Sequence, residues 1–96
     1  MSISVMGKGY IDYDDDFPKS SFIYDLNHAY GQPSIQIHED GHNYLEIEIW
    51  GTNYVDYNPL EKILKKYRKH FDGEIAINEW VESDGGLYFD PKEDEE

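Results

Sequence analysis

The sequence predicts a single α+β domain, in which an antiparallel sheet is covered on one face by two helices. Segments of alternating apolar and polar residues occur at the start, in the middle and near the end of the chain, as expected for strands that bury one face. Two segments with apolar residues at helical spacing lie between them. The 96 residues suit one domain, expected at residues 1–90, followed by an acidic, disordered tail at residues 91–96.

The first predicted strand spans residues 2–13, because apolar residues of one parity recur there. They are Ile3, Val5, Ile11 and Tyr13. Gly7 and Gly9 interrupt the alternation, which predicts a bulge or a bend. The first helix is predicted between Pro18 and Gly31, since proline suits a first helical turn and glycine suits a helix end. Its apolar stripe consists of Phe22, Ile23, Leu26 and Tyr30.

A β-hairpin is predicted from two alternating segments, residues 34–38 and 44–50. Directly opposed residues of an antiparallel pair lie on the same face of a sheet, so Ile37 is expected to lie opposite Leu45. This register leaves a three-residue loop at residues 40–42, with the sequence Asp-Gly-His, which is a common hairpin form.

The second helix is predicted to begin at Asn58 as the cap, with Pro59 in the first helical position and Glu61 three residues after the cap. Its apolar face consists of Leu60, Ile63, Leu64, Tyr67 and Phe71. The Asp-Gly sequence at residues 72–73 is expected to end the helix.

Two further strands are predicted at residues 74–81, with Ile75 and Ile77 facing the core, and at residues 87–89. A turn at residues 83–86 joins them. The element order is then βαββαβ plus a short edge strand. This order favours a ferredoxin-like two-layer sandwich, with shuffled variants of the same plan as alternatives.

Charge is segregated along the chain. The formal net charge is −13, but residues 59–71 contain five basic residues and one acidic residue, which gives +4, so the remainder carries −17. Such a field predicts a basic partner, such as a protein surface that normally binds phosphates, and disfavours bare nucleic acid and anionic lipid. The basic side chains are expected to form a solvated helix face or, alternatively, to contact the acidic face of a second copy or an acidic rim on the partner. They are Lys62, Lys65, Lys66, Arg68 and Lys69.

The chain contains no cysteine, which excludes disulfides and thiolate metal sites and fits a reducing compartment. No apolar segment approaches the ~18 residues that a membrane-spanning helix needs. The N-terminal residues also lack the apolar region of a signal peptide. A cytoplasmic location is therefore expected.

Strand parity predicts which residues occupy the sheet face that the helices leave open. They are Tyr10, Asp12, Gln36, His38, Tyr44, Glu46, Glu48, Trp50, Glu74, Asn78, Trp80 and Glu82. An RNA-binding sheet would combine such aromatic residues with lysine and arginine, so the carboxylates favour imitation of nucleic acid. Two alternatives stay open. The aromatic residues could serve sheet stability, with glutamate adding solubility, or a second copy of the chain could cover this face.

Two segments resemble metal sites without meeting their requirements. Residues 38–42, His-Glu-Asp-Gly-His, match the H-E-x-x-H zinc motif, which needs a helix to place both histidines on one face, whereas a hairpin is predicted here. Residues 12–16 begin like a calcium loop, but Phe17 and Ile23 occupy the positions of its glycine and its glutamate. These segments are interpreted as a turn with solvated histidines and as part of an acidic surface.

Glu46 and Glu48 form a pair of carboxylates on one face of a strand, about 6.7 Å apart. Glycosidases use carboxylate pairs at comparable distances, but an open sheet implies no cleft for a sugar. We therefore expect no enzymatic activity, no cofactor and no metal ion.

Short segments resemble the ends of small uncharacterised bacteriophage proteins, namely residues 6–11 (MGKGYI), 73–80 (GEIAINEW) and 84–88 (DGGLY). In its size, acidity and lack of cysteine, the chain is also similar to phage-borne inhibitors of host defence, including anti-CRISPR and anti-restriction proteins that mimic DNA. These resemblances imply a phage protein that acts in the cytoplasm of the host cell. They also imply a CRISPR effector or a restriction enzyme as its target.

The sequence thus leads to the hypothesis of a non-enzymatic inhibitor that occupies the phosphate-binding surface of a nucleic-acid-binding host protein. The carboxylates expected to replace phosphates are Asp12, Asp14, Asp15, Asp16, Glu46, Glu48, Glu74, Glu79, Glu82 and Asp84. The expected aromatic anchors are Tyr10, Tyr44, Trp50 and Trp80. The alternative is an acidic adaptor or immunity-type protein that binds one basic toxin or enzyme without mimicking DNA.

Overall fold

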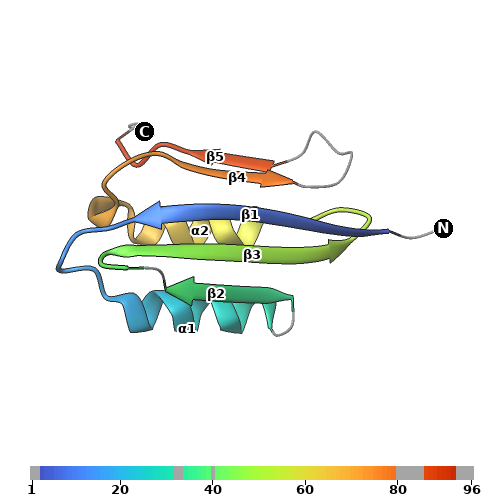
Figure 1. Cartoon of the computed structure of the whole chain (residues 1–96), viewed down its shortest axis with the longest axis horizontal. Coiled ribbons are helices and arrows are strands. Elements are labelled where there is room, and N and C mark those ends of the chain that lie inside the picture. The colour runs from blue at the N-terminus through green and yellow to red at the C-terminus, as the bar shows by residue number, and fades with distance from the viewer. Residues whose placement is uncertain (1–2, 32–33, 40, 80–85, 93–96) are drawn as a thin grey trace.

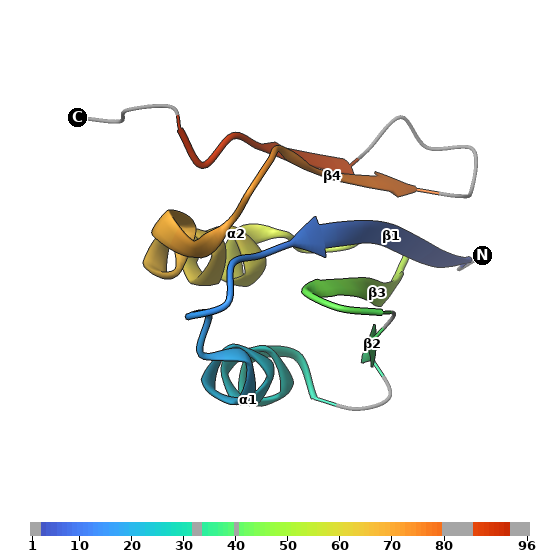
Figure 2. The same ribbon diagram turned by 60° about the vertical axis from the view of Figure 1, so that its left-hand side comes forward.

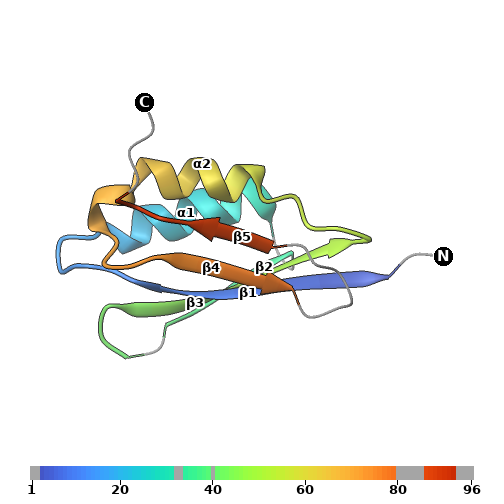
Figure 3. The same cartoon turned by 90° about the horizontal axis from the view of Figure 1, so that it is seen from above.

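A computed structural model of the chain describes residues 3–31, 34–39, 41–79 and 86–92. Its antiparallel sheet has the strand order β2-β3-β1-β4-β5 (Figure 1). The strands are β1 (Ser4–Asp12), β2 (Ile35–Glu39), β3 (Tyr44–Thr52), β4 (Ile75–Glu79) and β5 (Gly86–Phe89). Helices α1 (Lys19–Tyr30) and α2 (Asn58–Lys66) lie on one face of the sheet, and the short 3-10 helix η1 (Arg68–His70) follows α2 (Figure 3).

The prediction of a small α+β domain with an antiparallel sheet and two helices is confirmed. Figure 2 shows the two layers next to each other. The helices α1 and α2, which contact each other, form the layer on the left, and the strands form the layer on the right. The order of the whole sheet differs from that of a four-stranded ferredoxin-like sheet, because β5 pairs with β4 and extends the sheet at that edge. The predicted turn between β4 and β5 falls largely on residues 80–85, which lie outside the described residues.

The core lies between the two layers and takes alternate residues from the strands. Its fully buried side chains include Val5, Ile11, Leu45, Ile47, Ile49, Ile75 and Ile77 from the sheet and Phe22, Leu26, Leu60 and Leu64 from the helices. Ile3 has the same parity as Val5 but is 48% exposed, because it precedes the first paired residue of β1. Since these side chains all face the helices, the residues of opposite parity define the open face of the sheet.

The predicted bulge in the first strand is wrong. β1 pairs with β3 residue for residue from Ser4 opposite Thr52 to Asp12 opposite Tyr44. Glycine is needed at these two positions for a different reason, which is that neighbouring groups lie too close to leave room for a side chain. A Cβ atom on Gly7 or Gly9 would meet atoms of residues packed on the helix-covered side or in β4. The groups that it would meet are the Tyr57 hydroxyl, the Ile77 side chain and the Ala76 backbone oxygen.

We expect the substitution Gly9→Ala to lower the free energy of unfolding by about 1–3 kcal/mol, because the added methyl overpacks this site. Gly73→Ala is the control, since a Cβ atom there meets nothing within 4 Å. It should change stability by less than about 0.5 kcal/mol. Urea unfolding followed by circular dichroism measures both values, and equal stabilities of the two variants would contradict the close approach at Gly9.

The predicted register of the hairpin is wrong by two residues. Ile37 pairs with Ile47, and Leu45 pairs with Glu39. Four residues therefore separate the strands, and two of those described have left-handed backbone angles: Gly41 with a φ of 81° and Asn43 with a φ of 59°. Because side chains alternate with a period of two, this shift leaves every predicted residue on its predicted face.

The predicted cap of the second helix also differs from the structure. The cap position is Tyr57, whose side chain makes no capping bond, and the helix begins at Asn58 with Pro59 in its first turn. Instead, Asp56 Oδ1 accepts a hydrogen bond from Asn58 N at 3.1 Å. The Tyr30 hydroxyl accepts a bond from Leu60 N at 2.9 Å, and burial raises the pKa of Tyr30 to about 12. A tyrosine at the end of α1 therefore satisfies an amide of the first turn of α2.

Candidate functional site: an acidic end and an aromatic open face

Most residues predicted for the open face lie there. β1, β2, β3 and β4 place Tyr10, Asp12, Gln36, His38, Tyr44, Glu46, Glu48, Trp50 and Asn78 on that face by parity. Glu74 is exposed and directly precedes β4. Trp80, Glu82 and Asp84 lie outside the described residues.

Glu79 does not join this group. It shares the parity of Ile75 and Ile77, whose side chains face the helices. Its Oε2 accepts a hydrogen bond from the Tyr57 hydroxyl at 2.8 Å. Burial, followed by this bond, raises the pKa of Tyr57, so the hydroxyl keeps its proton and remains a donor. Glu79 therefore helps to hold the segment before α2 against the sheet.

Two tyrosines of the open face form a stacked pair. Tyr10 and Tyr44 are diagonal neighbours on β1 and β3, with ring centroids 5.5 Å apart and an interplanar angle of 5°. Tyr10 is 44% exposed. Trp50 is also exposed but lies six residues along β3 from Tyr44, a distance of about 20 Å. Tyr88 on β5 is a further exposed aromatic residue, which was not among the predicted site residues.

Lys8, which was not predicted as a site residue, lies at the centre of the open face. Its Nζ is 3.3 Å from Glu46 Oε2 and 3.7 Å from Glu48 Oε2. A hydrogen bond to Glu46 raises the pKa of Lys8, so the ammonium stays charged. The expected bulge between Gly7 and Gly9 had obscured the parity that Lys8 shares with Tyr10. One lysine therefore partly neutralises two of the carboxylates expected to imitate phosphates.

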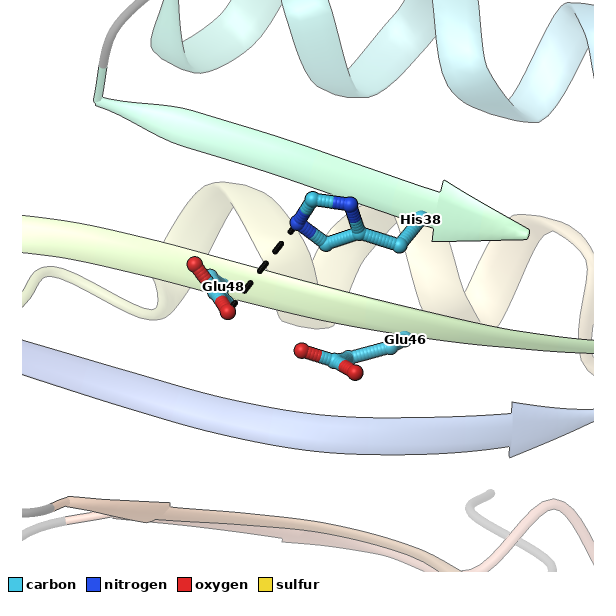
Figure 4. A group of neighbouring side chains, drawn as sticks. All are labelled: His38, Glu46 and Glu48. Atoms are coloured by element: carbon cyan, nitrogen blue, oxygen red, sulfur yellow. Dashed lines mark ion pairs between the residues drawn. The ribbon is translucent and has the colours of Figure 1, made fainter. Parts of the chain in front are cut away.

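His38 lies beside the same two carboxylates. It is directly opposite Glu46 across the β2–β3 pair, and its Nε2 is 4.0 Å from Glu48 Oε2. Figure 4 shows the imidazole of β2 and the two carboxylates of β3 gathered on the same face of the sheet, with the ion pair between His38 and Glu48 drawn as a dashed line. One ligand atom from each of the three residues lies within 4.8 Å of the other two.

The aspartates at residues 14–16 fold into a turn that is tied to other segments. Asp14 Oδ1 accepts a bond from Asp16 N at 3.1 Å and lies 3.0 Å from His70 Nδ1. Asp15 accepts a bond from Asn43 Nδ2 at 2.7 Å. The turn is therefore held between the β2–β3 loop and the end of η1.

Topology brings further carboxylates to this end of the sheet. Asp72 N donates a hydrogen bond to Asp12 O at 3.0 Å, and Glu74 and Asp90 border the same surface hollow. We call this set the acidic end. It comprises Asp12, Asp14, Asp15, Asp16, Asp72, Glu74 and Asp90. Asp72 and Asp90 were not predicted as site residues, because only the sheet order places the ends of β1 and β5 beside the start of β4.

The predicted basic face is partly used within the domain. Lys66 Nζ lies 3.0 Å from Asp25 Oδ2, and the Tyr67 hydroxyl donates to the same oxygen at 2.6 Å. The bond from Tyr67, followed by that from Lys66, lowers the pKa of Asp25. Arg68 Nε donates to Pro91 O at 3.3 Å. Pro91 and Lys92 form a turn, and the rest of the predicted tail, residues 93–96, lies outside the described residues.

Comparisons of the chain with protein-family models, with curated proteins and with solved structures found no match. The fold and the site define a small α+β domain with an acidic end and an aromatic open face. Within the described part of the chain, no helix is long and apolar enough to cross a membrane.

Proposed function

We propose that this protein is a non-enzymatic inhibitor that binds a nucleic-acid-binding host protein in place of nucleic acid. It acts in the host cytoplasm, and a CRISPR effector or a restriction enzyme is its target, as the resemblance in size and acidity implies. The observation that supports this proposal best is the acidic end, which lies beside the stacked pair of Tyr10 and Tyr44.

The acidic end suits a phosphate-binding surface because its exposed carboxylates project from several segments of the chain. Asp12, Asp16, Asp72 and Glu74 are all exposed. The adjacent tyrosine rings offer flat surfaces on which an arginine guanidinium can stack. Lys8 partly neutralises Glu46 and Glu48, so the acidic end, rather than the centre of the open face, makes the first contacts with the target.

The test is competition with nucleic acid. A tagged form of the protein captures partners from nuclease-treated host lysate, and each captured nucleic-acid-binding protein is then loaded with fluorescent duplex DNA or guide RNA. We expect the inhibitor to displace the labelled nucleic acid, with an association rate that falls at least tenfold between low and high salt, because exposed charges steer the encounter. A partner that binds without displacement and independently of salt would contradict mimicry and favour the adaptor alternative.

We further propose that the domain is an extended variant of the ferredoxin-like plan. Within the sheet, the order β4-β1-β3-β2 matches the βαββαβ arrangement, and β5 adds one strand beside β4. Such an assignment accounts for the placement of both helices on one face, which leaves the other face free for a partner.

A further inference from the structure

We infer that His38, Glu46 and Glu48 form a binding site for Zn²⁺ on the open face of the sheet. The site is separate from the acidic end, and the inference does not depend on the proposed inhibitory function. β2 supplies the imidazole and β3 supplies both carboxylates, in positions fixed by the pairing of His38 with Glu46 (Figure 4).

The donor set selects the metal. One imidazole nitrogen and two carboxylate oxygens suit zinc, whereas magnesium and calcium prefer oxygen ligands alone. The three ligand atoms lie within 4.8 Å of one another, and zinc bonds of about 2.0–2.2 Å bring such atoms to about 3.5 Å apart. Rotations about the side-chain bonds of the two glutamates close this gap without a change in the backbone. Water completes the tetrahedron.

A second observation is that the carboxylates already hold a cation. Lys8 Nζ contacts an oxygen of Glu46 at 3.3 Å and an oxygen of Glu48 at 3.7 Å. The side chains of Glu46 and Glu48 are only 17% and 18% exposed, so both are held close to the sheet. The ammonium of Lys8 would compete with a metal ion for these oxygens. Zinc binding therefore requires Lys8 to release these oxygens.

Because Lys8 and zinc compete for the same carboxylates, two substitutions should have opposite effects on zinc affinity. His38→Ala removes the nitrogen ligand and should weaken zinc binding by at least about tenfold. Lys8→Met removes the competing charge and should strengthen zinc binding. A non-specific acidic surface attracts cations through its total charge, so it would respond to Lys8→Met as it would to the loss of any other lysine. It would not lose zinc in the His38→Ala protein, because that substitution leaves the formal net charge at −13.

The experiment is a titration of the metal-free full-length chain with Zn²⁺ alone, at pH 7.5, in competition with a chromophoric chelator. His42→Ala is the matched control, because His42 belongs to the same hairpin but is 87% exposed and lies 3.5 Å from Asp15 instead. Circular dichroism confirms that each variant is folded. We expect one zinc ion per chain, weaker binding for His38→Ala, tighter binding for Lys8→Met and no change for His42→Ala.

Three results would overturn the inference. The first is a wild-type chain that binds no zinc at millimolar concentration. The second is equal loss of binding in the His38→Ala and His42→Ala proteins. The third is a Lys8→Met protein that binds zinc no more tightly than the wild type does. None of these results affects nucleic-acid displacement, so failure of the zinc site and failure of the proposed function are distinguishable.

Discussion

Replacing Phe22 with alanine is expected to lower the free energy of unfolding by about 3–5 kcal/mol. Phe22 lies on α1, is fully buried, and packs among aromatic rings from three other parts of the chain. Its ring centroid is 5.1 Å from that of Phe17, 5.5 Å from that of Tyr67 and 6.0 Å from that of Phe71. The substitution leaves a cavity that rigid neighbouring rings cannot fill.

The loss is large relative to the total stability expected of a small domain, about 5–15 kcal/mol. Urea unfolding followed by circular dichroism measures it. Tyr24→Ala is the matched control, since Tyr24 lies on the same helix and is 67% exposed, and it should cost less than about 0.5 kcal/mol. Similar midpoints for the two variants would show that the aromatic cluster does not support the fold.

The same cluster links the core to the acidic end. Phe17 directly follows the turn at residues 14–16, and its ring centroid lies 5.8 Å from that of His70. His70 in turn contacts Asp14 at 3.0 Å. The position of the aspartates therefore depends on apolar packing, and the Phe22→Ala protein should lose part of the order of this turn as well as stability.

Features with a strong local signal were predictable from the sequence. The parity of the strands placed Ile35, Leu45 and Ile75 in the core. The apolar stripe of the second helix likewise identified its buried face, with Leu60 and Leu64. Each of these patterns repeats over several residues, so an error at one position does not alter the result.

Features that depend on distant residues were not predictable. Gly7 and Gly9 suggested a bulge, whereas their cause is the approach of Tyr57 and β4 from elsewhere in the chain. The hairpin register depended on left-handed angles at Gly41 and Asn43, and asparagine gives only a weak signal for such a conformation.

In the candidate site, too, features with a local signal were predictable and features that depend on distant residues were not. Parity identified the aromatic residues of the open face, but the false bulge removed Lys8 from it and so hid the neutralisation of Glu46 and Glu48. The acidic end joins segments that are far apart in the sequence, including the residues around Asp12, Asp72 and Asp90. Only the strand order brings them together.

The second large effect is expected when the acidic end is neutralised. A quadruple variant replaces exposed carboxylates with amides of the same shape: Asp12→Asn, Asp16→Asn, Asp72→Asn and Glu74→Gln. We expect its affinity for the target to fall on the order of 100-fold at low salt, because exposed ion pairs contribute up to about 1 kcal/mol each. The salt dependence of association should weaken in parallel. Surface plasmon resonance at several salt concentrations measures both effects.

The control variant has the same net charge as the quadruple variant, but its substitutions lie in a different part of the sequence. Replacing the four carboxylates of residues 93–96 with amides also adds four units to the formal net charge of −13, which gives −9. If binding depends on total charge alone, the two variants lose equal affinity, and the acidic end has no special role. If the acidic end replaces phosphates at defined positions, the tail variant keeps most of its affinity, because its four changes leave every carboxylate of the acidic end in place. The comparison therefore separates a surface that imitates nucleic acid from a chain that is merely acidic.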